Sequence, residues 1–155
     1  LQNIEELDGK TVAFPSPNAL GAALIPRAQF AKKFKINVSP KYVKSHSSVY
    51  LNVATGAASA GGGVQKTFNS QPESIRKVLK IIYKTPEVEP HPIAVHPRVA
   101  PVVAEKIRAA FLALGATEKG AGLLQKIPMK KIGTATIDDY ALLKTMGLAE
   151  FYVVD

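Results

Sequence analysis

Short apolar runs alternate with helical patterns over the first half of the chain, and this alternation limits the fold more than any other feature. Strands are expected at 11–14 and 41–44, and helical patterns over 18–34 and from 45 to Gly56 follow them. Parallel strands joined by helices give this order, because each crossover helix returns the chain to the same edge of the sheet. The sequence therefore predicts an α/β fold with a mostly parallel sheet and flanking helices.

Residues at the ends of these segments refine the prediction. Asn18 is the expected N-cap of the first helix, and Pro26 is expected to kink that helix or to end its first half. The hydroxyl side chains at 45–48 offer N-caps for the second helix, which Gly56 closes. Residues 58–64 (ASAGGGV) suit a short buried strand whose backbone another chain segment or a ligand approaches closely.

The rest of the chain divides into two further strand candidates and a helical region. Residues 72–74 open a short turn or helix, 79–83 (LKIIY) predict a strand, and 91–96 (HPIAVH) are another strand candidate. Helices are expected at 102–114, 120–126 and 136–146, where Thr136 and Asp139 form a capping box. The segment 84–97 contains four prolines, which indicates an extended connector between two structural units.

Composition excludes several classes of protein. Apolar residues make up 46% and charged residues 21% of 155 residues, which is typical of a folded domain. There is no cysteine for a disulfide or thiolate metal site, and no apolar run long enough to span a membrane. The first ten residues lack the basic and apolar regions of a signal peptide. The net charge of +8 suggests nucleic acid as a partner, but the lysines are spread along the chain, so a solvated basic surface is the preferred interpretation.

A set of motifs stands in a defined order over residues 7–146. They are GKTVAF at 9–14, the spacing of Pro17, Gly21 and Pro26, Ser45-His46 followed by Val53 and Gly56, ASAGG at 58–62, LKIIYKTP at 79–86, and TIDDY at 136–140. This order resembles that of the phosphate-, phosphite- and phosphonate-binding proteins of ABC importers, which have the two-lobed type II periplasmic binding fold.

The resemblance implies a solute-binding component of an ABC importer, without a cofactor or catalytic residues, that acts in the periplasm or another extracytoplasmic space with a permease as its partner. Residues 8–84 would form the second lobe, 85–97 the hinge, and 98–155 C-terminal helical elements of the first lobe. The N-terminal part of the first lobe has no counterpart here, so we expect either a fragment or a truncated relative. No catalytic motif such as G-x-S-x-G, a P-loop or H-E-x-x-H occurs, so an enzyme is not predicted.

The resemblance places an oxyanion at the turn 16–21 (SPNALG). The first N–H groups of a helix are unpaired and lie at the positive end of its dipole, and Gly21 permits a close approach of the anion. Ala19 and Leu20 stand where the family has hydroxyl side chains, and Ser16 and Asn18 are partial substitutes. Both a weakened anion site and a purely structural turn therefore remain open.

A second group of candidate ligand residues follows the next expected strand. By resemblance, His46 faces the cleft and contacts the anion, with Ser45 and Ser47 beside it. Ser59 replaces an acidic residue of many phosphonate binders, which favours a simple oxyanion, or a more apolar ligand that tolerates Leu20, over an aminophosphonate. A small residue packed beside the glycine strand is the slightly preferred interpretation of Ser59. Three tyrosines are expected in the core and not at a ligand, namely Tyr50, Tyr83 and Tyr140. No metal site is predicted, because His91 and His96 have no third ligand nearby.

Two other functions are compatible with the sequence. A ligand-free sensor or interaction domain that keeps the fold is the main alternative, and nucleic-acid binding is a weaker one. The apolar stripes of helices 102–114 and 136–146 would be exposed without the rest of a first lobe, so we expect a homodimer through these helices or packing of the helices onto the chain's own sheet.

Overall fold

The computed structural model describes residues 1–127, 129 and 131–154. Strand β1 (Thr11–Phe14) lies between β2 (Ser39–Tyr42) and β3 (Ala60–Gly61), and both neighbours run parallel to it. These strands make a three-stranded parallel sheet within the described residues. The predicted α/β class with a parallel sheet and flanking helices is therefore confirmed.

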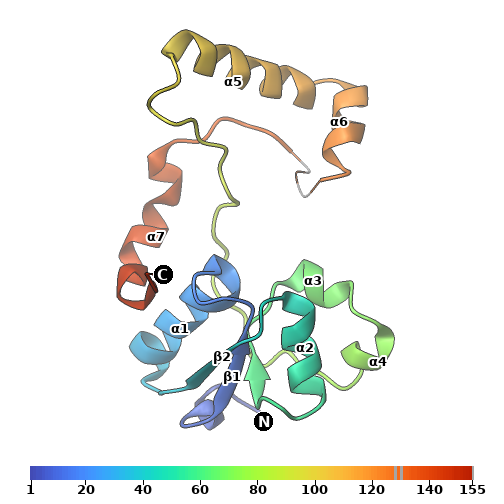
Figure 1. Cartoon of the computed structure of the whole chain (residues 1–155), viewed down its shortest axis with the longest axis vertical. Coiled ribbons are helices and arrows are strands. Elements are labelled where there is room, and N and C mark those ends of the chain that lie inside the picture. The colour runs from blue at the N-terminus through green and yellow to red at the C-terminus, as the bar shows by residue number, and fades with distance from the viewer. Residues whose placement is uncertain (128, 130, 155) are drawn as a thin grey trace. The chain divides into compact units, whose positions relative to one another are not determined.

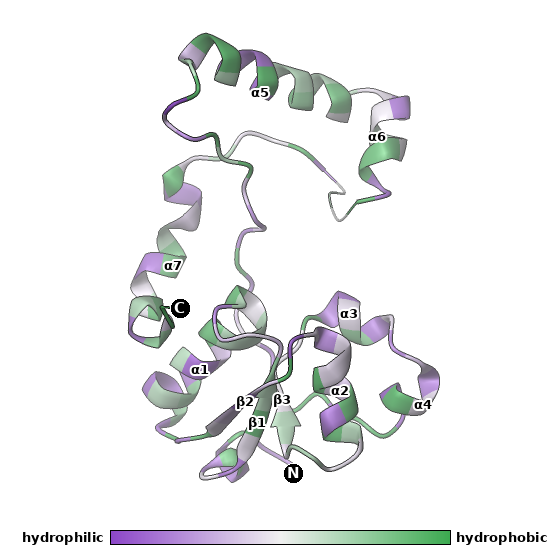
Figure 2. Cartoon of the chain, in the orientation of Figure 1, coloured by the Kyte–Doolittle hydropathy of each residue, from purple (hydrophilic) through white to green (hydrophobic). Residues whose placement is uncertain are grey.

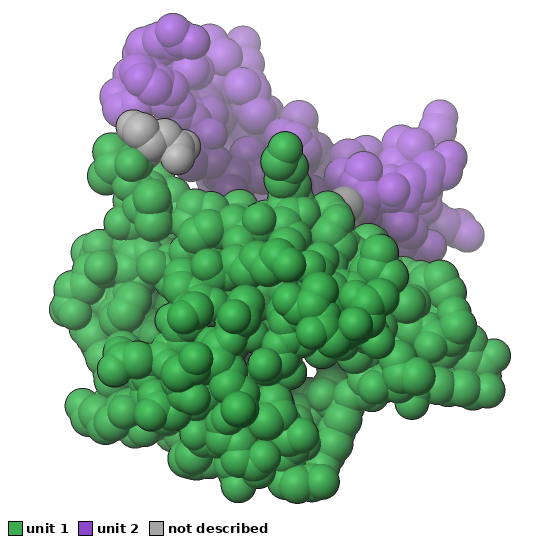
Figure 3. All heavy atoms as spheres, turned by 60° about the horizontal axis from the view of Figure 1, so that its bottom comes forward, with its two compact units in different colours: residues 1–88, 142–155 green, residues 89–141 purple. Residues whose placement is uncertain are grey.

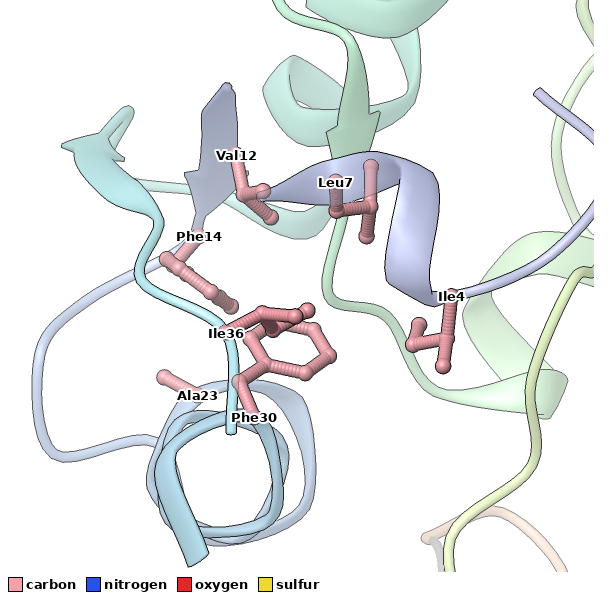
Figure 4. Packing of buried hydrophobic residues seen from close by; sticks show 7 residues of the cluster. All are labelled: Ile4, Leu7, Val12, Phe14, Ala23, Phe30 and Ile36. Atoms are coloured by element: carbon pink, nitrogen blue, oxygen red, sulfur yellow. The ribbon is translucent and has the colours of Figure 1, made fainter. Parts of the chain in front are cut away.

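Side chains of β1 point alternately to two apolar layers. Val12 and Phe14 face a cluster with Ile4, Leu7, Ala23, Phe30 and Ile36 (Figure 4). Ala13 faces the other way, toward Val49 and Ala58. Helices α1 (Ile25–Gln29) and α2 (His46–Ala54) consequently flank the sheet on either side (Figure 1).

The first crossover helix is continuous from Leu20 to Phe34, although its hydrogen-bonding pattern changes. It begins with a π-helical stretch η2 (Leu20–Leu24), continues as α1 and ends in a second π-helical stretch η3 (Phe30–Phe34). Pro26 does not end the helix. It lies in the first turn of α1, where its missing N–H coincides with the change from π to α bonding.

The second crossover follows the prediction closely. Ser45 is the N-cap of α2, and Gly56 with φ of 76° closes the turn after the helix. The helices α3 (Gln65–Asn69) and α4 (Glu73–Arg76) come after β3, and α4 begins where the short turn or helix at 72–74 was expected. Strand β2 begins and ends two residues before the predicted range, because Lys44 with φ of 68° leaves the extended conformation.

Two predicted strands are wrong. Residues 79–83 form no strand in the described structure; Ile82 and Tyr83 pack their side chains against the core cluster, and the Tyr83 hydroxyl donates to Gln29 at 2.9 Å. With β3 only two residues long, few backbone groups are available for a further ladder on that side. Residues 91–96 are likewise not a strand, because the prolines within and around them remove backbone donors.

The described structure divides into two compact units, 1–88 with 142–155, and 89–141 (Figure 3). The second unit contains α5 (Pro101–Gly115), α6 (Glu118–Leu124) and the 3-10 helix η4 (Ile137–Tyr140). In η4 the backbone N–H of Thr136 donates to the Asp139 carboxylate at 2.6 Å, as the capping box requires. Tyr140, expected in the core, is instead half-buried and donates its hydroxyl to the Pro90 carbonyl at 3.0 Å.

No residue of α5 is buried, and its ribbon carries hydrophobic residues over much of its length (Figure 2). Val102 and Val103 are 63% and 45% exposed. Within the described residues, none of the helices has the length and apolar character needed to cross a membrane. The first unit is completed by η1 (Glu5–Leu7), most of α7 (Ala141–Thr145) and η5 (Leu148–Phe151), which packs on α1.

Candidate functional site

The two strand-to-helix turns leave the same edge of the sheet. Phe14 and Tyr42 are paired at the carboxyl ends of β1 and β2, and the Val43 N–H donates to the Phe14 carbonyl at 2.9 Å. The chain then turns into η2 on one side and α2 on the other. Open parallel sheets bind ligands at this carboxyl edge, where successive crossovers run to opposite faces.

The first turn presents unpaired backbone donors. Ala19 has an extended conformation, and its carbonyl accepts from Ala23 at 2.7 Å and from Leu24 at 3.0 Å. The N–H groups of Leu20, Gly21 and Ala22 consequently have no acceptor among the described residues. Gly21 is exposed, with no heavy atom within 4 Å of the position where a Cβ would stand. This turn has the backbone of an anion site.

Asn18 does not cap this helix, contrary to the prediction. The N-cap is Ala19, and the Asn18 amide forms two hydrogen bonds with the backbone of Val153 instead. Its Nδ2 donates to the Val153 carbonyl at 2.7 Å, and its Oδ1 accepts from the Val153 N–H at 2.9 Å. This reciprocal pair uses both ends of the amide, which a cap would use at one end only. Ser16 is exposed at the same turn and donates to no described residue.

The second turn also presents unpaired backbone N–H groups, next to an N-cap residue, Ser45, whose hydroxyl is already hydrogen-bonded. The Ser45 hydroxyl accepts from the Ser48 N–H at 3.1 Å and donates to the Ser48 hydroxyl at 2.9 Å, so its hydrogen bonds are already used. The N–H groups of His46 and Ser47 have no acceptor in the described part of the chain. The Ser47 hydroxyl is exposed and accepts from Gln71 at 3.3 Å.

His46 carries the most unusual atom of this edge. Its Nδ1 is buried and has no hydrogen-bond partner among the described residues. Buried polar atoms are nearly always paired, so an orphaned ring nitrogen at a helix N-terminus needs an explanation. The tight turn before it includes Lys44 in the left-handed region, a conformation that non-glycine residues adopt at a cost and that clusters at ligand sites.

Ser59 lies apart from the other candidates. Its N–H donates to the carbonyl of Thr11, at the amino end of β1, whereas both turns lie at the carboxyl end. It lines a cavity of about 680 Å³ that also includes Gly21, Tyr50 and the glycines 61–63. Ser59 and Gly21 are the candidate residues in the cavity lining; the remaining lining side chains are mostly apolar.

The glycines after Ser59 are explained by close packing within the protein. A Cβ on Gly62 would meet the Ala22 carbonyl oxygen and the Phe14 ring, and a Cβ on Gly63 would lie 2.5 Å from the Tyr50 hydroxyl. Tyr50 is 6% exposed, and its hydroxyl bonds to both backbone groups of Val64 and to the Thr67 hydroxyl. The prediction of Tyr50 as a core residue is confirmed, and it also holds the exit of β3 in place.

Sequence reasoning missed Arg27, which lies beside the first turn. Its guanidinium donates to the carbonyls of Pro17 at 3.2 Å and Phe151 at 3.0 Å, and no carboxylate forms a salt bridge with it among the described residues. No local sequence pattern indicates this role, because the two carbonyls that Arg27 binds lie 10 and 124 residues away along the chain.

A comparison with protein families agrees with this architecture. The model of the family described as ABC transporter, phosphonate, periplasmic substrate-binding protein matches residues 1–140. The family is a class of transport proteins and not of enzymes; it implies a small ligand, a transporter partner and a periplasmic location. Because the match covers most of the sequence, the chain belongs to the phosphonate substrate-binding proteins of ABC transporters.

Proposed function

We propose that the carboxyl edge of the sheet binds a simple oxyanion, namely a phosphonate, phosphate or phosphite, for delivery to an ABC permease. The donors are the N–H groups of Leu20 and Gly21 in the first turn, those of His46 and Ser47 in the second, and the His46 ring. The observation that carries the proposal is the buried Nδ1 of His46, which has no partner among the described residues and belongs to the turn with the free N–H groups of His46 and Ser47. A ring nitrogen that holds a proton donates to an anionic oxygen, which would remove this unsatisfied group.

The number of donors is sufficient for useful affinity. A hydrogen bond to a charged group contributes about 1.5–3 kcal/mol. Micromolar binding needs about 8 kcal/mol, which lies within the roughly 6–15 kcal/mol that four or five such bonds give even without hydroxyl side chains at 19 and 20. Ser59 lies at the opposite end of β3 and would then not contact an oxyanion as small as phosphate.

Isothermal titration with phosphate, phosphite and methylphosphonate tests this function. We expect heat with at least one of them and a loss of about tenfold in affinity for His46→Ala, which corresponds to one hydrogen bond. His91→Ala is the matched control, since His91 is exposed and lies in the other unit. The absence of heat for all three anions, or equal affinity of His46→Ala and the wild type, would contradict the proposal.

A ligand-free sensor or interaction domain is the second candidate. It is favoured by the apolar side chains of Ala19 and Leu20 and by the engagement of the Asn18 amide and the Ser45 hydroxyl within the protein. Strong thermal stabilisation by a small oxyanion would exclude it, because a ligand stabilises only a state that binds it.

The lobe assignment and a homodimer remain parts of this proposal. Residues 8–84 would be the second lobe, 85–97 the hinge and 98–155 elements of the first lobe. The exposed apolar side chains of α5 supply a surface for a second copy. Size-exclusion chromatography with light scattering decides this point: a dimer mass is expected, and a monomer mass would contradict the dimer.

A further inference from the structure

The segment 147–153 is bound to the same turn and helix that the proposed site uses. Its backbone pairs with the Asn18 amide through Val153, at 2.7 and 2.9 Å, and accepts from Arg27 through the Phe151 carbonyl at 3.0 Å. Lys32, further along the helix, donates to the Gly147 carbonyl at 3.3 Å and to the Glu150 carboxylate at 2.8 Å.

The oxygen atoms of this segment accept hydrogen bonds from the kinds of group that would also bind an anion. Apart from the Val153 N–H, the segment offers carbonyl and carboxylate oxygens. These meet the Asn18 amide at the turn, Arg27 beside it, and Lys32 further along the same helix. The Phe151 ring lies under both cations, with its centroid 6.0 Å from the Arg27 guanidinium carbon and 5.8 Å from Lys32 Nζ. Glu150 is the only carboxylate within salt-bridge distance of either cation in the described residues.

The contacts that attach the segment 147–153 to the first turn and its helix are weak enough for the segment to detach. The hydrogen bonds are exposed, except for the part-buried bond from Arg27 to the Phe151 carbonyl. The Glu150 and Lys32 side chains are 68% and 40% exposed, so water screens their ion pair. No residue of η5 is buried. A short segment without a fully buried residue, held mostly by exposed hydrogen bonds, opens locally at low free-energy cost.

We propose that 147–153 is an internal competitor for the oxyanion: when it is bound, it holds Asn18 and Arg27, and when it is released, these two side chains join the donors of the anion site. This inference rests on the proposed function, because it concerns regulation of that same site. The anion therefore binds more tightly to molecules with the segment released, and a variant that favours release binds it with a lower apparent dissociation constant.

The test uses the full chain and three variants, titrated calorimetrically with methylphosphonate and with inorganic phosphate. Val153→Pro removes the N–H that Asn18 accepts from, and Phe151→Ala removes the ring under the two cations. Val154→Pro is the matched control, because Val154 is 83% exposed. Val153→Pro and Phe151→Ala are expected to bind about three- to tenfold more tightly than the wild type, the equivalent of one hydrogen bond, and Val154→Pro to bind like it.

Hydrogen exchange supplies an independent readout. Saturating methylphosphonate should speed exchange of the Val153 amide in the wild type, because that amide loses its Asn18 acceptor. Equal affinities for the wild type and both weakened variants, or a Val153 amide that exchanges no faster with ligand, would overturn the competitor while leaving the proposed function intact. No heat with any of the four proteins would overturn both together.

Discussion

Gly62 shows at the residue scale why this chain contains a run of glycines. Its N–H donates to the Ala13 carbonyl at 2.9 Å, and its α-carbon passes against the Ala22 carbonyl and the Phe14 ring. The helix that follows the first turn of the proposed site therefore sits directly against the residue after β3. Any side chain at this position would push the turn away from the sheet.

Gly62→Ala is accordingly expected to destabilise the protein by about 1–3 kcal/mol, the usual cost of overpacking a tight contact. Gly21→Ala is the control for stability, because no atom lies within 4 Å of its added Cβ. Urea denaturation followed by circular dichroism measures both. Equal midpoints for Gly62→Ala and Gly21→Ala would contradict the packing described here.

Asn18 and Ser45 show which residue roles can be predicted from sequence. Both precede a helix and both are good N-caps by type. Ser45 acts as predicted because a cap depends only on the three residues after it. Asn18 does not, because its partner Val153 is 135 residues away and leaves no local pattern. The unpaired Nδ1 of His46 could not be predicted from the sequence either, since the burial of a single ring atom depends on tertiary packing.

At the element scale, the prediction was correct for elements that depend on apolar periodicity and helix caps. It was wrong for segments that need a neighbouring strand to pair with. The strand β1, the helix α2 and the helices α5 and α6 follow from apolar periodicity and caps. The LKIIY segment at 79–83 has the composition of a strand, but a strand needs a partner, and β3 is too short to supply one. Its side chains pack on the core without a ladder.

The exposed helix α5 carries a testable electrostatic pair. Arg108 donates two hydrogen bonds to the Glu105 carboxylate, at 2.7 and 2.9 Å, which lowers the pKa of Glu105 and raises the pKa of Arg108. Because the folded-state pKa of Glu105 is depressed, the pair's contribution is present above the carboxyl group's ordinary pKa and is lost as pH falls through the lowered value.

Arg108→Gln should return the pKa of Glu105 toward its ordinary value, measured by NMR titration of the side-chain carboxyl carbon. Its effect on stability should be negligible, since both groups are exposed and screened. Arg98→Gln, on an exposed residue before the helix, is the control. An unchanged Glu105 titration in Arg108→Gln would contradict the pair.

At the scale of the whole molecule, the order of motifs predicted the family correctly, although no single motif identifies it. The division into compact units was less predictable. Residues 142–155 belong with 1–88, through contacts such as the hydrogen bond from Arg27 to the Phe151 carbonyl. No local sequence pattern predicts such a contact.

The two units should differ in local stability. Val12, Ala13 and Phe14 in β1 are almost fully buried, whereas α5 contains no buried residue. Native-state hydrogen exchange should therefore find the β1 amides protected for much longer than those of α5, because helices without buried apolar contacts open locally. Protection of α5 equal to that of β1 would contradict this ordering and would indicate a covering partner such as a second copy.

The central claim is that backbone donors at two helix N-termini hold one oxyanion, and amide NMR during a methylphosphonate titration tests it most directly. We predict that the N–H signals of Leu20, Gly21, His46 and Ser47 shift together along a single binding curve, while those of α5 do not move. Shifts confined to one of the two turns, or no shift at either, would contradict the account.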